Sequence, residues 1–240
     1  MRKAVLGLWM SCMLATVTAA AASTQDDPEM AAALAKCPSA AAFVRAQEQA
    51  KADAATAAPA EATAAPSDPA LRARLLEMER LDQQVRNGDW SQEAMGKMLA
   101  MDAEHLPQMR RIVADHDGLP SVAQVGRDGV AAAWLLVQHA DADPALQERV
   151  LGTLTRHGAR SGEVSAHQLV LLTDRVLIAN GTPQRYGSQL IPEQGRWVSK
   201  PIADPAQVDV LRAGMDEMPL ADYVCVATQL FPVPSTPPGS

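Results

Sequence analysis

Helical spacing of apolar residues is the feature of this sequence that most restricts its fold. In the first clear run, apolar residues recur at steps of four and three, so they share one face of a helix. That face comprises Leu71, Leu75, Met78, Asp82 and Val85. Aromatic residues, which strands favour, make up only 3% of the chain. The sequence therefore predicts a mainly α fold with a core of Leu, Val, Met and Ala.

Capping residues and glycines set the expected helix boundaries. Three Asp-Pro pairs, beginning at Asp68, Asp143 and Asp204, are typical of helix starts. We expect an irregular helical domain of about six helices with one small β-hairpin near the C-terminal end. The helices are predicted over residues 68–88, 95–118, 127–140, 144–158, 165–181 and 204–213, and the hairpin over 183–202 around "PEQG". In the second helix, Pro107 either kinks the helix or starts a new one.

The chain divides by composition into five segments. They are a signal peptide (1–22), an Ala-rich helical extension (23–56), a Pro/Ala linker (57–70), a helical core domain (71–225) and a disordered tail (226–240). The extension is expected to be mobile or loosely docked. A short basic and apolar start followed by small residues predicts cleavage near Ala22 and a periplasmic or secreted protein. A retained anchor helix is the alternative for this start, and no later segment is apolar enough to span a membrane.

Charge and cysteine usage exclude several classes of partner. The formal net charge is −7 and no basic patch stands out, so nucleic acid is not an expected partner. Without CxxC or HxxxH spacing, no metal and no other cofactor is expected. Cys37 and Cys225 remain after signal removal, and they form either one disulfide or two free thiols.

Charged and amide side chains interrupt the apolar faces. Asp82 and Asp102 fall within apolar stripes, and "QHAD" places His139 at the end of a buried helix. Burying an unpaired charge is costly, so such groups should pair with one another. We predict one polar cluster where the helices meet the hairpin. Its candidate members are Asp82, Gln83, Arg86, Asp102, Gln138, His139, Asp141, Asp174, Arg175, Gln184, Tyr186 and Gln189.

Several of these residues lie in motifs that resemble a known family. The motifs are "DQQVR" (82–86), "GLPSVAQVG" (118–126), "AAWLLVQHADADPALQ" (132–147), "LTDRV" (172–176) and "PQRYGSQ" (183–189). Together they resemble the bacterial domain-of-unknown-function family 6624, whose hallmarks are DQxxR, QHAD, DRV and QxYGTQ, over roughly Leu71 to Tyr223. Leu119 stands where Trp is expected and Ser188 where Thr is expected, and neither change removes a titratable group. The resemblance implies the domain limits and the importance of the polar residues, and it implies no activity.

Three functions remain open for the cluster. In the first, it binds a small polar ligand, with Gln138, Gln184, Gln189 and Tyr186 as donors and acceptors and Arg175 holding an anionic group. In the second, the chain is a hydrolase with His139 as general base, oriented by Asp141 or Asp174, while Tyr186 or Arg175 stabilises developing charge. In the third, the chain is a module that binds another envelope protein through an exposed apolar patch. A purely structural network of buried ion pairs is the alternative to all three.

The other histidines are interpreted as surface residues. His105 and His116 are predicted on an exposed or edge face of the second helix. His157 lies at a helix end and His167 in a first turn.

Overall fold

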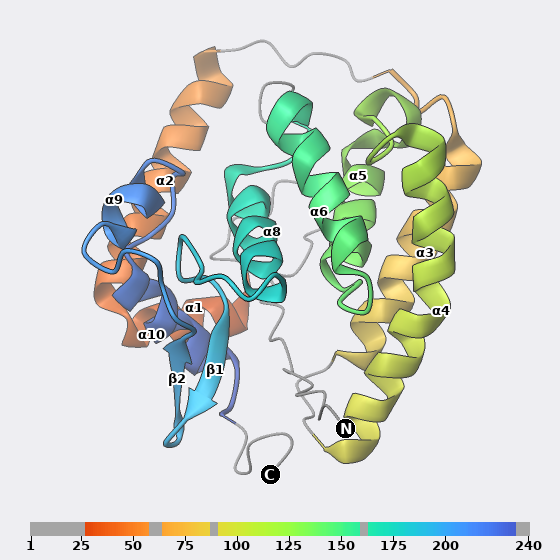
Figure 1. Cartoon of the computed structure of the whole chain (residues 1–240). Coiled ribbons are helices and arrows are strands. Elements are labelled where there is room, and N and C mark those ends of the chain that lie inside the picture. Colours follow the sequence, from red (N-terminus) through yellow and green to blue (C-terminus); the bar gives the residue numbers. More distant parts are fainter. Residues whose placement is uncertain (1–26, 58–63, 87–90, 159–162, 234–240) are drawn as a thin grey trace. The chain divides into compact units, whose positions relative to one another are not determined.

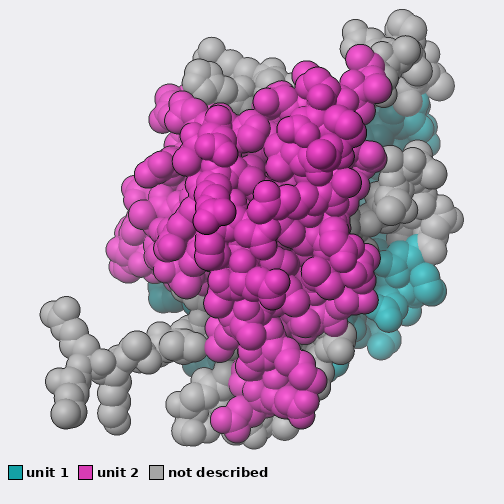
Figure 2. All heavy atoms as spheres, turned by 90° about the vertical axis from the view of Figure 1, so that its right-hand side faces the viewer, with its two compact units in different colours: residues 1–62, 185–240 teal, residues 63–184 magenta. Residues whose placement is uncertain are grey.

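The computed structural model describes residues 27–57, 64–86, 91–158 and 163–233 (Figure 1). Within these ranges, nine α-helices, one π-helical turn and one two-stranded antiparallel hairpin confirm the predicted mainly α fold. The chain forms two compact units, coloured separately in Figure 2. Unit 1 combines residues 1–62 with 185–240, and unit 2 consists of residues 63–184. The predicted signal peptide lies outside the described residues.

Unit 2 is a helical unit in which α3 packs against α4 and α5, and α6 packs against α8. Its helices are α3 (Pro69–Val85), α4 (Gln92–His116), α5 (Val122–Gln138), α6 (Pro144–Thr153) and α8 (Ala166–Ala179). Two of the three predicted Asp-Pro starts are present, since the carboxylates of Asp68 and Asp143 accept hydrogen bonds from the amides of Leu71 and Leu146. After α6 the chain continues as a π-helical turn, Leu154–Gly158.

Helix α4 is continuous through Pro107, so this proline does not start a new helix. Proline lacks an amide hydrogen, so the carbonyl four residues earlier, at Ala103, has no helical donor. Both residues are exposed, so water can bond that carbonyl. Leu99, three residues before Asp102 on α4, is 49% exposed.

Helix α5 begins before the predicted residue 127 and contains a kink. Ser121 and Gln124 form a capping box at its start, and Gly126 interrupts the helix with φ +75°. Near this kink, the backbone amides of Ser67 and Asp68 donate to the carbonyls of Ala123 and Gln124. The segment before α3, predicted as a linker, is thus bonded to α5.

Unit 1 contains helices from both ends of the chain and the hairpin. Its elements are α1 (Pro28–Lys36), α2 (Pro38–Ala57), β1 (Leu190–Glu193), β2 (Arg196–Ser199), α9 (Val208–Ala213) and α10 (Leu220–Leu230). Gln194 and Gly195 both have positive φ, as a tight two-residue hairpin turn requires. Helix α9 starts four residues after the predicted Asp204, because the carboxylate of Asp204 bonds the amide of Ala206 in a turn.

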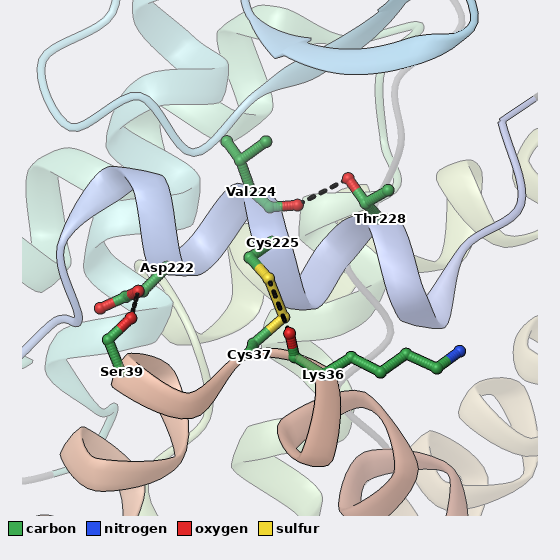
Figure 3. Close-up of a disulfide and its surroundings, with 7 residues drawn as sticks. All are labelled: Lys36, Cys37, Ser39, Asp222, Val224, Cys225 and Thr228. Carbon is green, nitrogen blue, oxygen red and sulfur yellow. Dashed lines mark hydrogen bonds between the residues drawn. A yellow bond between two sulfur atoms is a disulfide. The ribbon is translucent and has the colours of Figure 1, made fainter.

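A disulfide between Cys37 and Cys225 joins the α1–α2 junction to α10, as Figure 3 shows. Beside it, the hydroxyl of Ser39 donates to the carboxylate of Asp222. The disulfide lies in an apolar core that consists of Met30, Ala33, Leu34, Cys37, Ala40 and Val226. The Ala-rich extension is therefore packed, and the prediction of a mobile or loosely docked segment is wrong for residues 27–53.

The predicted disordered tail is also partly wrong. Helix α10 continues to Leu230, because Val226 and Ala227 bury their side chains. Residues 234–240 lie outside the described part of the chain. Among the helices that the structure describes, none is both long and apolar enough to cross a membrane.

Candidate functional site

Four side chains from three helices of unit 2 form a charged network, which we call the Asp82 cluster. It consists of Asp82 in α3, Arg86 at the end of α3, Asp102 in α4 and His139 at the end of α5. Asp82 is fully buried because it lies in the apolar stripe of α3, which packs against α5. Asp82 contacts the His139 ring directly, whereas Asp102 is joined to that ring only through Arg86.

Asp82 is the centre of the cluster. Both of its carboxylate oxygens lie 2.9 Å from Nδ1 of His139. Nη2 of Arg86 lies 3.2 Å from one of them, and the amide of Gln83 donates to the other at 2.8 Å. The same Nη2 of Arg86 also contacts Asp102. The arginine thus neutralises part of the charge of two carboxylates.

The contacts of His139 determine its protonation. Nδ1 faces the Asp82 carboxylate and also lies 2.9 Å from Nε of Arg86, and one ring nitrogen cannot both donate and accept. We assign the proton to Nδ1, because a hydrogen bond to an ionised carboxylate is stronger than one from arginine to a neutral ring. Arg86 keeps both of its carboxylate contacts in this arrangement. The assignment leaves the lone pair of His139 on Nε2.

Burial and charge shift the pKa values of all three titratable partners. Burial lowers the pKa of His139, the Arg86 charge lowers it further, and the bond to Asp82 opposes this shift only in part. Burial raises the pKa of Asp102 to about 6, with Arg86 opposing and Asp82 and Asp141 adding to the rise. Burial alone would raise the pKa of Asp82, but the hydrogen bond from His139 and the Arg86 charge bring it below its usual value. His139 is therefore neutral near pH 7, beside an ionised Asp82.

A small hollow adjoins the cluster. Its lining residues are Asp82, Asp102, His105, Leu106, Leu136, His139 and Ala140. The hollow has room for about one water molecule. Among the residues that the structure describes, neither Nε2 of His139 nor Nδ1 of His105 has a hydrogen-bond partner, and both nitrogens are buried. The site thus combines a polarised imidazole with space for a very small molecule.

A second ion pair lies near the cluster. Nη1 of Arg175 in α8 lies 2.6 Å from the Asp141 carboxylate. The side-chain amide of Gln147 in α6 donates to the backbone carbonyls of Val137 and Gln138, which come just before Asp141 in the chain. The charge of Arg175 lowers the pKa of His139, and that of Asp141 raises the pKa of Asp102. The "QHAD" turn is therefore held between α6 and α8.

The predicted residues divide into four groups. The first group is in direct contact and consists of Asp82, Gln83, Arg86, Asp102 and His139. The second group is the ion pair of Asp141 and Arg175. Gln138, Asp174 and Gln184 are buried in unit 2. Tyr186 and Gln189 belong to unit 1, where Tyr186 offers its carbonyl to Arg212 at 2.9 Å and Gln189 donates to Ser188 at 3.2 Å. Their predicted convergence with the unit 2 residues stays a prediction.

His105 is the residue that the sequence interpretation missed. It is only 4% exposed and lines the hollow, so its assignment to an exposed or edge face is wrong. A second apolar pattern could have found it, because His105, Met109 and Ile112 follow one another at steps of four and three. Met109 and Ile112 are both buried on this face of α4.

The residues of the site do not suggest a metal centre. No three His, Cys, Asp or Glu side chains within the described ranges are placed to hold a metal ion. The chemistry that the cluster offers is proton transfer at Nε2 of His139.

Comparison with known proteins assigns the chain to a family. The model of DUF6624, a family of unknown function, matches residues 69–233, which is more than half of the chain. The chain belongs to this family. No curated protein and no solved structure matches it. In this DUF6624 protein the match includes every residue of the Asp82 cluster, whereas α1 and α2 lie before the matched region.

Proposed function

We propose that this protein is an exported hydrolase in which His139, oriented by Asp82, acts as the general base. The observation that carries the proposal is the Asp82–His139 pair, with Nδ1 held by a buried carboxylate and Nε2 buried without a partner beside the hollow. A carboxylate on one ring nitrogen fixes the tautomer and makes the other nitrogen more basic. This role of Asp82 replaces the predicted orienting role of Asp141 or Asp174.

The proposed step transfers one proton. Nε2 of His139 accepts a proton from water while the water oxygen attacks the electrophilic atom of the substrate. The imidazolium is stabilised by the Asp82 carboxylate, which remains ionised. The proton then passes to the leaving group as its bond to the substrate breaks, so the base is regenerated.

The hollow has the size of the attacking water and is smaller than a pocket for a sugar or nucleotide fragment, and a hydrolase substrate also needs an opening beside it. Ligand pockets of that kind enclose several hundred cubic ångströms, roughly 300 or more. The hollow beside His139 has room for about one water molecule. The ligand-binding function stays a prediction that needs a larger opening.

Two features of the sequence and structure support export. The first 22 residues carry the pattern of a secretory signal. The disulfide between Cys37 and Cys225 is of a kind that persists in oxidising compartments such as the periplasm. We therefore propose a periplasmic or extracellular location.

The test uses the purified chain and a panel of p-nitrophenyl acetate, phosphate and glycosides. His139→Gln and Asp82→Asn should each lower kcat/KM by about 100-fold or more on the substrate that is hydrolysed. Asp128→Asn is the matched control, because Asp128 also pairs with an arginine between α3 and α5, namely Arg72. It should leave the rate within about twofold.

Two results would contradict the proposal. One is that no substrate of the panel is hydrolysed. The other is that the Asp82 and His139 variants keep the rate while losing stability, which would make the cluster a structural network.

A further inference from the structure

Two histidines from different helices, each with one unpartnered ring nitrogen among the described residues, line the same small hollow. His105 lies in α4 and His139 at the end of α5, and each side chain is buried with about 4% of the residue exposed. Nδ1 of His105 and Nε2 of His139 have no hydrogen-bond partner within the described part of the chain, and both residues line the hollow. The other ring nitrogen of His139 is already bonded to Asp82.

Leaving two such nitrogens unsatisfied is unfavourable. A buried polar group without a partner costs about 1–3 kcal/mol. A buried water compensates this cost where it finds two or more polar partners. The hollow has room for about one water, and His105, His139 and Asp102 are among the residues that line it.

We infer that the hollow holds one ordered water that bridges Nε2 of His139 and Nδ1 of His105, and that His105 positions this water for attack. The second part rests on the proposed function. In the proposed step, the water gives one proton to His139 while its bond to His105 fixes the direction of the oxygen lone pair. His105 neither gains nor loses a proton, and it is therefore a positioning residue.

The surroundings of His105 keep it neutral for this role. Burial lowers the pKa of His105, and the Arg86 charge acts in the same direction. The carboxylates of Asp82 and Glu104 oppose this shift without reversing it. A neutral ring does not repel the imidazolium that forms on His139.

The experiment compares crystal structures and hydrolysis rates of the full chain and three variants. In the unaltered chain we expect a water within about 3.2 Å of both nitrogens. His105→Leu should lose this water and about 10-fold in kcat on p-nitrophenyl acetate. His105→Asn has nearly the shape of leucine and keeps a polar group near the Nδ1 position, so it should retain the water and restore most of the rate.

The control variant is His116→Leu, on the same helix. His116 bonds the carbonyl of Ile112 in its own helix, so its loss should change neither the water nor the rate. An empty hollow, a water that contacts only one ring, or equal rates for His105→Leu and the unaltered chain would overturn the inference. A bridging water in a chain whose rate is independent of His139 would instead refute the proposed function and leave the water site standing.

Discussion

Asp102 is a carboxyl group that folding makes harder to ionise. Burial raises its pKa from 3.8 to about 6. Between these two values the folded chain keeps the proton and the unfolded chain loses it. The contribution of Asp102 to stability is therefore fully present below pH 3.8 and is lost as the pH rises through about 6.

Asp102→Asn should consequently stabilise the protein at pH 8. We expect the free energy of unfolding to rise by about 1–2 kcal/mol, and the gain to shrink as the pH falls towards 4. Urea unfolding at both pH values measures this. Asp128→Asn is the comparison, because Arg72 holds the pKa of Asp128 below its usual value, and its loss should destabilise the chain at pH 8. A loss of stability in Asp102→Asn at pH 8 would contradict the account.

Because His139 is neutral near pH 7, we can predict the pH range in which activity is lost in acid. Its folded pKa lies below 6.5, so the acid limb of kcat/KM for p-nitrophenyl acetate should have its midpoint below pH 6.5. The limb should persist in Asp102→Asn, which removes the carboxyl group whose pKa is about 6. A midpoint above 6.5 in that variant would show that the base is not a buried neutral imidazole.

At the scale of elements, the kink of α5 at Gly126 lies beside an ion pair between α5 and α3. Gly126 has φ +75°, which side chains rarely adopt, and a Cβ added there would lie 2.9 Å from Oδ1 of Asp128. Asp128 is the partner of Arg72 in α3. The same α3–α5 packing places Asp82 against His139 at the other end of the two helices.

Gly126→Ala should destabilise the protein by about 1–3 kcal/mol, because it adds strain and displaces the Asp128 carboxylate. Thermal unfolding measures the loss. Gly96→Ala in α4 is the matched control, since a Cβ there meets nothing within 4 Å. It should raise stability by about 0.5–1 kcal/mol. Equal effects of the two changes would mean that the kink carries no strain.

Sequence patterns predicted which face of a single helix is buried better than they predicted which helices pack against it. The spacing in α3 placed Asp82 inward, and "QHAD" placed His139 at a buried helix end, because both depend on local periodicity. The burial of His105 depends on which helices pack around α4, and a pattern on α4 alone had two possible faces. The packing of α1 on α10 required contact between residues nearly the whole chain apart, which local patterns do not encode.

At the scale of the whole molecule, one covalent bond joins the two ends of the described chain. The disulfide between Cys37 and Cys225 spans 188 residues and lies beside the α1–α10 core (Figure 3). A cross-link that closes so long a loop restricts the unfolded chain strongly.

Replacing both cysteines by serine should lower the free energy of unfolding by about 2–4 kcal/mol. Thermal unfolding with and without dithiothreitol checks this prediction. The reductant should destabilise the unaltered chain and leave the Cys37→Ser/Cys225→Ser variant unchanged. If the two chains unfold at the same temperature under oxidising conditions, the bond does not contribute to stability.

The central claim is that Asp82 fixes the proton of His139 on Nδ1. The tautomer of the His139 ring can be measured without knowing the substrate. Long-range ¹⁵N–¹H correlation spectra of the histidines at pH 7.5 distinguish the two tautomers, and His139→Gln assigns the signals. The account predicts a protonated Nδ1 and an unprotonated Nε2 for His139, and a change of this pattern in Asp82→Asn. A proton on Nε2, or on both nitrogens, would contradict it.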